Sequence, residues 1–219
     1  MTDTPLTRAD APDSRDTRGQ IRQANEALIL AAAERTFAVA GFSGATMARI
    51  AEESGLPKAN LHYYFGSKET LYRAVLSRIL KDWLAPTDGI TPEADPATAL
   101  GDYIRSKMAL SASRPHASKV WANEILHGAP VVKQLIATEL RATVVAKSAV
   151  IDQWITQGKM APVDSTHLFF TLWAATQTYA DFDVQMCAVL GREQLTDADH
   201  ARATAHVVGL VLRGCGLAV

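Results

Sequence analysis

The chain has 219 residues, of which 48% are hydrophobic and 21% charged, enough for one packed domain or two small ones. No uninterrupted apolar run reaches the length of a membrane span, and the polar N-terminus lacks the apolar segment of a secretory signal. We therefore expect a cytoplasmic protein without a membrane partner. The formal net charge of −1 argues against a general nucleic-acid coat protein.

Charged residues are unevenly distributed along the chain. Residues 18–86 contain nine Lys or Arg and six Asp or Glu, whereas residues 87–219 contain eleven and thirteen. This distribution favours a polyanionic partner at one end of the molecule only. Cys187 and Cys215 are the only cysteines, and each lies in an apolar helical pattern. We expect two buried thiols rather than a disulfide or a metal site.

Helical periodicity begins after a polar segment. Residues 1–19 are mixed in charge and poor in apolar residues, and we expect them to form a disordered tail. The first helix follows, because apolar residues recur at steps of three and four until Gly41 provides a left-handed end. Its apolar stripe is formed by Ile29, Ala32, Ala33, Phe37 and Ala40.

Two short helices are predicted next. Thr46 is a suitable N-cap for a helix over Met47–Ser54, which Gly55 ends. Pro57 favours the start of a second short helix over Lys58–Tyr64, since proline suits the first helical turn.

A fourth helix begins after Ser67 and runs to Pro86. The segment 87–96 is rich in Pro, Gly and Asp and predicts a loop, so we divide the chain into domains of residues 20–86 and 87–219. Further helices are predicted at 96–112, 115–127, 130–157, 164–189 and 195–216. No strand pattern appears, and the predicted fold class is all-α with about nine helices.

The two short helices, separated by Gly-Leu-Pro and braced by a longer helix on either side, are typical of a helix-turn-helix. A two-turn helix is not stable alone, so Leu56, Leu61 and Phe65 must pack against the bracing helices and leave the opposite face exposed. That face offers Lys for phosphate or guanine, Asn for adenine and Tyr for phosphate, a composition suited to duplex DNA. The residues expected to contact DNA are Thr46, Lys58, Ala59, Asn60, His62, Tyr63 and Lys68.

These segments resemble a known family. Residues 24–76 are similar to the DNA-binding domain of the TetR family of bacterial repressors, because the phenylalanines, the glycines, the capping threonine and the segment YYFGSKE fall at the family's intervals. The resemblance implies a homodimer in which each subunit places its third helix in the major groove of a palindromic operator. Two positions depart from the family pattern: Pro57 stands where Ser is usual, and His62 where Tyr is common.

The second part of the chain carries candidate residues for a small-molecule site. Gln177 follows Trp173 by four residues, so the indole and the carboxamide lie on one helix face. An indole can stack on a flat ring, and the amide presents a donor beside an acceptor, which matches the N–H and C=O of a lactam or imide. Ordinary core packing is the alternative for each tryptophan. The candidate effector residues are Trp83, Trp121, Glu124, Trp173, Gln177, Tyr103, Lys107 and Asp181.

Five segments of this part resemble a narrower branch of the same family, the repressors of pyrimidine utilisation. They are Lys81–Pro86, Asp102–Ser111, His127–Val132, Gly158–Asp164 and Trp173–Phe182. The resemblance implies uracil or thymine as the effector, with Trp173 and Gln177 in the pocket. A repressor of the same type that senses a different small planar or apolar ligand is the alternative. In either case, a ligand that tilts the helix carrying Trp83 would change the span between two recognition helices and release DNA.

The last two predicted helices are apolar on more than one face, which favours a dimer interface built from two helices of each subunit. The residues concerned are Leu168, Phe169, Phe170, Leu172, Val184, Val207, Val208, Leu210 and Val211. A buried core within one subunit is the alternative explanation.

Catalytic motifs are not found in the sequence. It contains no His-Glu-x-x-His, Gly-x-Ser-x-Gly, phosphate-loop or paired-cysteine pattern, so we expect neither an enzyme nor a cofactor or metal site. The histidines in or beside apolar helices are interpreted as incidental; they are His127, His167, His200 and His206. A helical adaptor bundle without DNA binding is the remaining alternative, and it would leave Lys58, Asn60 and Tyr63 without a role.

Overall fold

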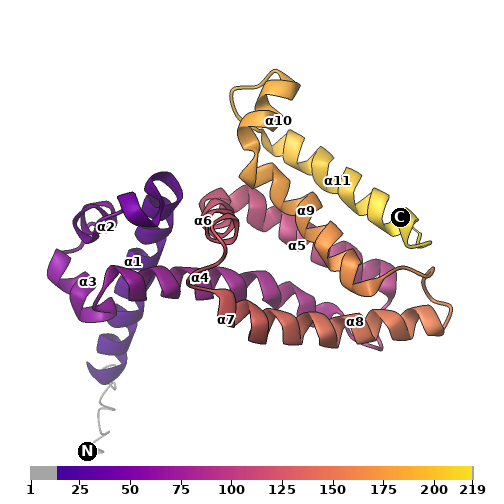
Figure 1. The fold of residues 1–219 in the computed structure, drawn as a ribbon, viewed down its shortest axis with the longest axis horizontal. Helices are drawn as coiled ribbons and strands as arrows, with labels where there is room; N and C mark the ends of the chain where they lie inside the picture. Colours follow the sequence, from indigo (N-terminus) through magenta and orange to yellow (C-terminus); the bar gives the residue numbers. More distant parts are fainter. Residues whose placement is uncertain (1–13, 219) are drawn as a thin grey trace, which may run out of the picture.

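The computed structural model describes residues 14–218, and this range contains helices and turns but no strand. Figure 1 shows a small N-terminal head, a larger C-terminal body, and α4 (Lys68–Leu84) running from one into the other. The predicted all-α class is confirmed, and α4 is a continuous connection between the two parts.

Three further helices build the head. They are α1 (Ser14–Gly44), α2 (Met47–Ser54) and α3 (Lys58–Phe65). The Thr46 hydroxyl accepts from the Arg49 N–H at 3.2 Å, and Gly55 is left-handed with φ 68°. At the start of α4, the Ser67 hydroxyl accepts from the Thr70 N–H at 3.2 Å. These local signals place the ends of both short helices within one residue of the prediction.

α1 differs from its prediction at both ends. It begins at Ser14, inside the segment 1–19 that we expected to be disordered, and residues 1–13 of that segment lie outside the described part of the chain. Gly41 interrupts the helical backbone (φ 66°, ψ 176°), as predicted, but a further turn continues to Gly44.

The stretch Gly19–Gly44 of α1 has the length and mean hydropathy (1.2) of a membrane-crossing helix, contrary to our expectation from the sequence. Core helices of globular proteins pass the same test. Ile29 and Phe37 of this helix are fully buried in the head, so their apolar character is explained by packing.

The body contains a 3-10 turn, a π-helical stretch and several longer helices. In chain order they are η1 (Ala85–Gly89), α5 (Pro96–Ser113), α6 (Pro115–Leu126), α7 (Lys133–Leu135), η2 (Ile136–Leu140), α8 (Arg141–Thr156), α9 (Ser165–Asp181), α10 (Asp183–Leu190) and α11 (Asp197–Gly214). Two predicted helices were wrong in detail. The one expected at 164–189 is interrupted at Phe182, whose backbone is not helical (φ −120°, ψ 34°). The one expected from residue 130 begins at Lys133 and passes through η2.

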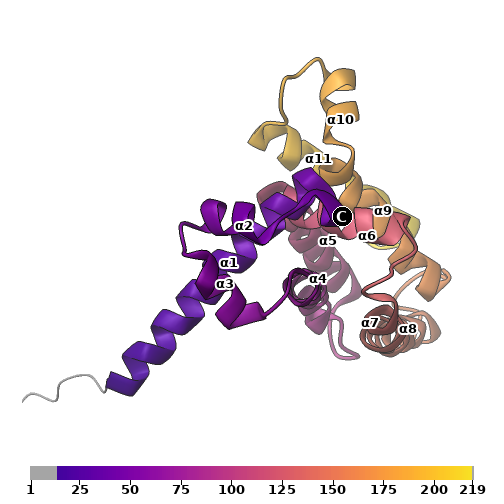
Figure 2. The ribbon, with the colours of Figure 1, turned by 60° about the vertical axis from the view of Figure 1, so that its left-hand side comes forward.

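One consequence of the break at Phe182 is that α10 stands out from the rest of the body (Figure 2). None of the residues of α10 is buried. Cys187 on this helix is therefore half-buried rather than buried as predicted, whereas Cys215 is buried.

Two apolar cores stabilise the molecule. The first contains buried residues of α1 to α4 and also Val120 and Trp121 of α6. The second is formed by α5, α8, α9 and α11, with Trp154 and Phe169 fully buried. The first core therefore continues beyond residue 86, where we placed the domain boundary, and the head packs on α6 as well as on α4.

Candidate DNA-binding face and effector cavity

The outer flank of α3 is exposed. Lys58, Ala59 and His62 lie on the surface, and the side chain of Tyr63 is 77% exposed, whereas Leu61 on the opposite side is fully buried. The geometry predicted for this flank is therefore confirmed: the helix packs through one side and presents a polar, basic surface on the other. Asn60 lies between the two and is half-buried.

The N-terminus of α3 can also contact an anion. Pro57 precedes the helix, and no side chain caps it; the Asn60 N–H donates to the Pro57 carbonyl oxygen (2.8 Å), so the N–H groups of Lys58 and Ala59 are the ones available to a phosphate. Exposed Thr46 lies before α2, and its oxygen already accepts from Arg49. Its hydroxyl hydrogen is still available to donate to a phosphate oxygen.

Neighbouring aromatic residues on α3 have structural contacts. The Tyr64 hydroxyl accepts from Asn25 Nδ2 of α1 at 3.2 Å, and Phe65 packs against the first core. His62 Nδ1 lies 3.0 Å from the Gly66 carbonyl oxygen, so this nitrogen donates and Nε2 is the nitrogen left for a base edge or phosphate.

Lys68 does not lie as we predicted. We expected it to contact a phosphate beside the recognition helix. Its ammonium group instead donates to the carbonyl oxygens of Phe42 (2.8 Å) and Ala45 (3.0 Å) and lies 4.5 Å from the centroid of the Phe42 ring. Because two of its three N–H groups are used inside the head, Lys68 connects α4 to the end of α1.

Five of the candidate effector residues surround one small cavity. It is lined by Leu80, Trp83, Leu84, Lys107, Trp121, Leu140, Trp173 and Gln177, and its volume is about 40 Å³. The Trp83 and Trp121 rings meet edge to face with centroids 5.7 Å apart. This volume holds one or two water molecules and is too small for a heteroaromatic ring, so the cavity is closed in this structure.

Lys107 places its ammonium group over the Trp83 ring in the wall of the cavity. Its ammonium nitrogen lies 3.9 Å from the centroid of the Trp83 ring, and the residue is only 2% exposed. Burial lowers the pKa of Lys107 to about 7, and the nearby charge of Asp181 opposes this effect. A ligand with carbonyl oxygens would give this ammonium group hydrogen-bond acceptors inside the cavity.

Tyr103 and Asp181 lie just outside the cavity rather than in its lining. The Tyr103 hydroxyl accepts from Trp173 Nε1 at 2.9 Å, and burial raises its pKa to about 12. Asp181 accepts from the Ser118 hydroxyl at 2.5 Å, and burial raises its pKa although Ser118 and Lys107 oppose the rise. Tyr103 therefore positions the indole of Trp173, which lines the cavity, whereas Asp181 acts on the lining residue Lys107 through its charge.

Glu124 is a correction to the predicted site. Although it follows Trp121 by three residues, its buried carboxylate does not line the cavity. It accepts from the N–H groups of Val131 (2.6 Å) and Val132 (3.1 Å) and from the Tyr72 hydroxyl (3.2 Å). Glu124 thus connects the loop after α6 to α4, and its role is structural.

Three lining residues were missed from the sequence. Leu80 and Leu84 are a helical turn before and one residue after Trp83, so helical spacing around that tryptophan could have found them. Leu140 comes from η2, and no local signal connects it with the other residues.

Comparisons with known proteins agree with this architecture. Residues 29–75 match the model of the bacterial regulatory proteins of the tetR family, and residues 76–218 match the C-terminal region of YcdC-like proteins. The HTH-type transcriptional regulator RutR of Escherichia coli (strain K12) is 40% identical over 197 residues, which cover 90% of this chain and 93% of RutR. The chain belongs to the TetR family.

Solved structures of TetR-like regulators share the fold. The SCO4942 protein of Streptomyces coelicolor superposes with a TM-score of 0.67 at 25% identity, covering 86% of this chain and 97% of that one. A tetR-family regulatory protein from Rhodococcus RHA1 gives a TM-score of 0.70 at 21% identity, covering 89% and 98%. This TetR-family chain is therefore a DNA-binding transcriptional regulator and not an enzyme.

Proposed function

We infer that this regulator is a cytoplasmic repressor whose effector is uracil or thymine. The observation that carries the proposal is the cavity in which Trp83, Trp121 and Trp173 surround the amide of Gln177 and the ammonium group of Lys107. Flat indoles stack on a planar ring, while the two polar groups are suited to its polar edge. The segments that resemble repressors of pyrimidine utilisation include Trp83, Lys107, Trp173 and Gln177.

Hydrogen-bond chemistry favours a ring with an N–H between two carbonyl groups. The Gln177 amide can donate to a carbonyl oxygen and accept from the adjacent N–H of the same ring. The Lys107 ammonium can donate to the second carbonyl oxygen, and this contact would replace its present position over the Trp83 ring. Uracil and thymine both carry this N–H edge with two carbonyl groups.

The closed cavity explains how the effector would control DNA binding. A ring does not fit into about 40 Å³, so its entry requires Trp83 or Lys107 to move. Trp83 lies on α4, and the first half of this helix packs into the first core through Leu71 and Val75. The effector would therefore shift α4 and the head attached to it, and change the span between two recognition helices.

The proposed dimer interface is formed by α9 and α11, as we expected from the sequence. Fewer of the expected apolar residues are exposed and therefore available to it. Six of the nine apolar residues are buried within one subunit: Leu168, Phe169, Leu172, Val207, Val208 and Val211. Leu210 (57%) remains exposed and lines a groove of about 600 Å³ between the two helices, and Phe170 (49%) and Val184 (78%) are exposed elsewhere on the body. A second copy covering this groove would bury Leu210 and place two heads for a palindromic operator.

Replacing Gln177 with alanine is expected to abolish the response to uracil while leaving operator affinity within about twofold, because Gln177 lines the cavity on α9 and is not part of the head that carries α3. Thermal-shift titration of the wild-type protein with uracil and thymine should raise its Tm as the native state becomes occupied. Gln153→Ala, an exposed position on α8, is the matched control and should respond as the wild type does.

Two results would contradict the proposal. The effector assignment fails if neither pyrimidine changes the Tm of the wild-type protein, and a screen of other planar or apolar ligands then identifies the alternative. The pocket assignment fails if Gln177→Ala releases DNA at the same uracil concentration as the wild type does.

A further inference from the structure

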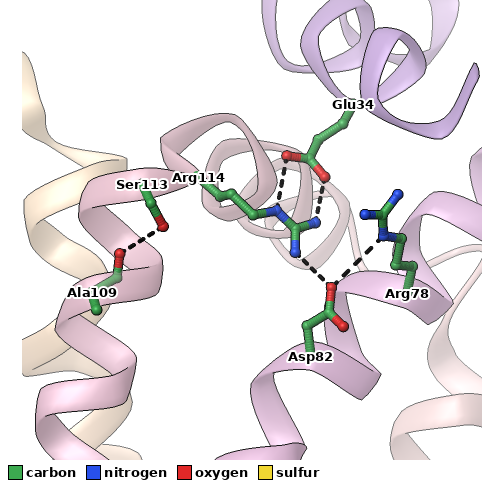
Figure 3. A network of polar contacts seen from close by, with 6 residues as sticks. All are labelled: Glu34, Arg78, Asp82, Ala109, Ser113 and Arg114. Atoms are coloured by element: carbon green, nitrogen blue, oxygen red, sulfur yellow. Dashed lines mark hydrogen bonds and ion pairs between the residues drawn. The ribbon is translucent and has the colours of Figure 1, made fainter. Parts of the chain in front are cut away.

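A network of charged side chains connects the head to the body where α5 ends and α6 begins (Figure 3). Arg114 donates to Glu34 of α1 through Nη2 (2.6 Å) and Nε (3.4 Å), and to Asp82 of α4 through Nη1 (2.5 Å). Arg78 Nε lies 3.8 Å from the same oxygen of Asp82. These four residues form the junction network.

The side chains of the junction network are partly shielded from water and strongly hydrogen-bonded. The side chains of Glu34 and Arg114 are 11% and 26% exposed. Burial alone would lower the pKa of Arg114, but its hydrogen bonds to Glu34 and Asp82 outweigh burial and raise it. A guanidinium that contacts a carboxylate through two nitrogens has little freedom of angle, so this contact fixes the orientation of α1 against the start of α6.

Among residues 19–218, whose side chains the structure describes, no other ion pair crosses from head to body. Arg35 with Glu53 lies inside the head, and Arg105 with Asp102 lies on one turn of α5. The remaining pairs likewise stay within the head, within α4 or within the body. The junction network is thus the specific ionic contact that sets the head against the body in the described structure.

The same network is adjacent to the effector cavity. Asp82 immediately precedes Trp83, whose ring forms part of the cavity wall, and both residues belong to α4. Arg114 immediately precedes α6, and Trp121 of that helix contacts Trp83 at 5.7 Å between ring centroids. Separating these two rings to admit a ligand therefore moves Asp82 relative to Arg114.

We propose that Arg114 is a positioning residue for the allosteric response: through Glu34 and Asp82 it holds the head in the DNA-binding arrangement, and effector entry breaks its contact with Asp82. This inference rests on the proposed function. In a two-state equilibrium, a contact made only in the DNA-binding arrangement opposes effector binding and favours operator binding, and the two fold-changes in affinity multiply to give the total change in the equilibrium constant. Removing the contact shifts the two affinities in opposite directions.

Arg114→Met tests this inference in the full-length protein. We expect uracil to bind about tenfold more tightly and the effector-free protein to bind its operator about tenfold more weakly. Glu34→Gln keeps the side-chain shape, is less disruptive to folding, and should shift both affinities in the same directions by a smaller factor. Arg114→Lys keeps one ion pair and should partly restore wild-type behaviour. Arg105→Met, which removes an exposed pair within α5, is the control and should change neither affinity.

The outcomes separate this inference from the proposed function. If both affinities fall together, or if neither changes, Arg114 has only a structural role and the inference is wrong. If the wild-type protein does not respond to uracil, the proposed effector is wrong. The operator affinities of the Arg114 and Glu34 variants then test this inference without the effector. Wild-type operator affinity in both Arg114→Met and Glu34→Gln would overturn the inference, whereas a graded loss in the two variants with an unchanged Arg105→Met would support it.

Discussion

Lys107→Met is expected to stabilise the protein at pH 7 by up to about 4 kcal/mol. The pKa of this buried lysine falls from an ordinary value of 10.5 to about 7 in the native state. Above pH 10.5 neither the folded nor the unfolded chain carries the charge, and folding suffers no penalty. As the pH falls toward 7, only the unfolded chain takes up the proton, so the wild-type protein loses stability; below pH 7 the loss is complete and constant.

Urea unfolding of the wild-type and Lys107→Met proteins at pH 7 and pH 9 measures this effect. Methionine keeps a similar aliphatic volume in the cavity, so the comparison isolates the charge. The advantage of the variant should narrow by about 2 kcal/mol between pH 7 and pH 9. Lys81→Met, at an exposed position of α4, should show no such pH-dependent difference. The same difference in unfolding free energy between Lys107→Met and the wild type at pH 7 and at pH 9 would contradict the lowered pKa of Lys107.

Glu124→Ala is expected to destabilise the protein by on the order of 3–5 kcal/mol, because it leaves the amides of Val131 and Val132 and the hydroxyl of Tyr72 without an acceptor. The loop it holds also contains Ala129, a residue with positive φ (57°), whose conformation depends on surrounding contacts. For a chain of this size the loss corresponds to a fall in Tm of about 6–20 °C.

Calorimetry of Glu124→Ala beside Asn123→Ala checks the prediction. Asn123 is the exposed neighbour on the same helix, and its replacement should leave the Tm nearly unchanged. Glu124→Gln retains one acceptor oxygen and should give an intermediate Tm. Equal Tm values for Glu124→Ala and Asn123→Ala would contradict the structural role assigned to this carboxylate.

The elements that could be predicted from the sequence are those set by local chemistry. Thr46, Gly55 and Ser67 define helix ends through contacts with residues three or four positions away, and the structure confirms these ends. The break at Phe182 could not be predicted, because no Gly or Pro marks it and the apolar pattern continues through it. Likewise, the apolar stripe of α6 gives no sign that part of it packs against the head rather than the body.

The candidate sites likewise contain some residues that local spacing predicts and others that it does not. The face shared by Trp173 and Gln177 follows from helical spacing, and both residues line the cavity. Glu124 and Lys68 contact groups outside their own helices, so helical spacing could not distinguish a ligand contact from a structural one. Arg114 was overlooked because its two carboxylate partners lie 80 and 32 residues away.

The central claim is that the exposed flank of α3 binds an operator. Fluorescence-anisotropy titration of a labelled palindromic duplex from upstream of the protein's own gene, with Lys58→Ala beside the wild type at several salt concentrations, tests it most directly. The wild type should bind with a steep salt dependence, and Lys58→Ala should lose about 1–3 kcal/mol if Lys58 contacts a base, or about one unit of salt slope if it contacts a phosphate. Lys133→Ala, exposed on the body, should match the wild type. Wild-type binding no stronger than to a scrambled duplex, or a Lys58→Ala curve identical to wild type in affinity and slope, would contradict the account.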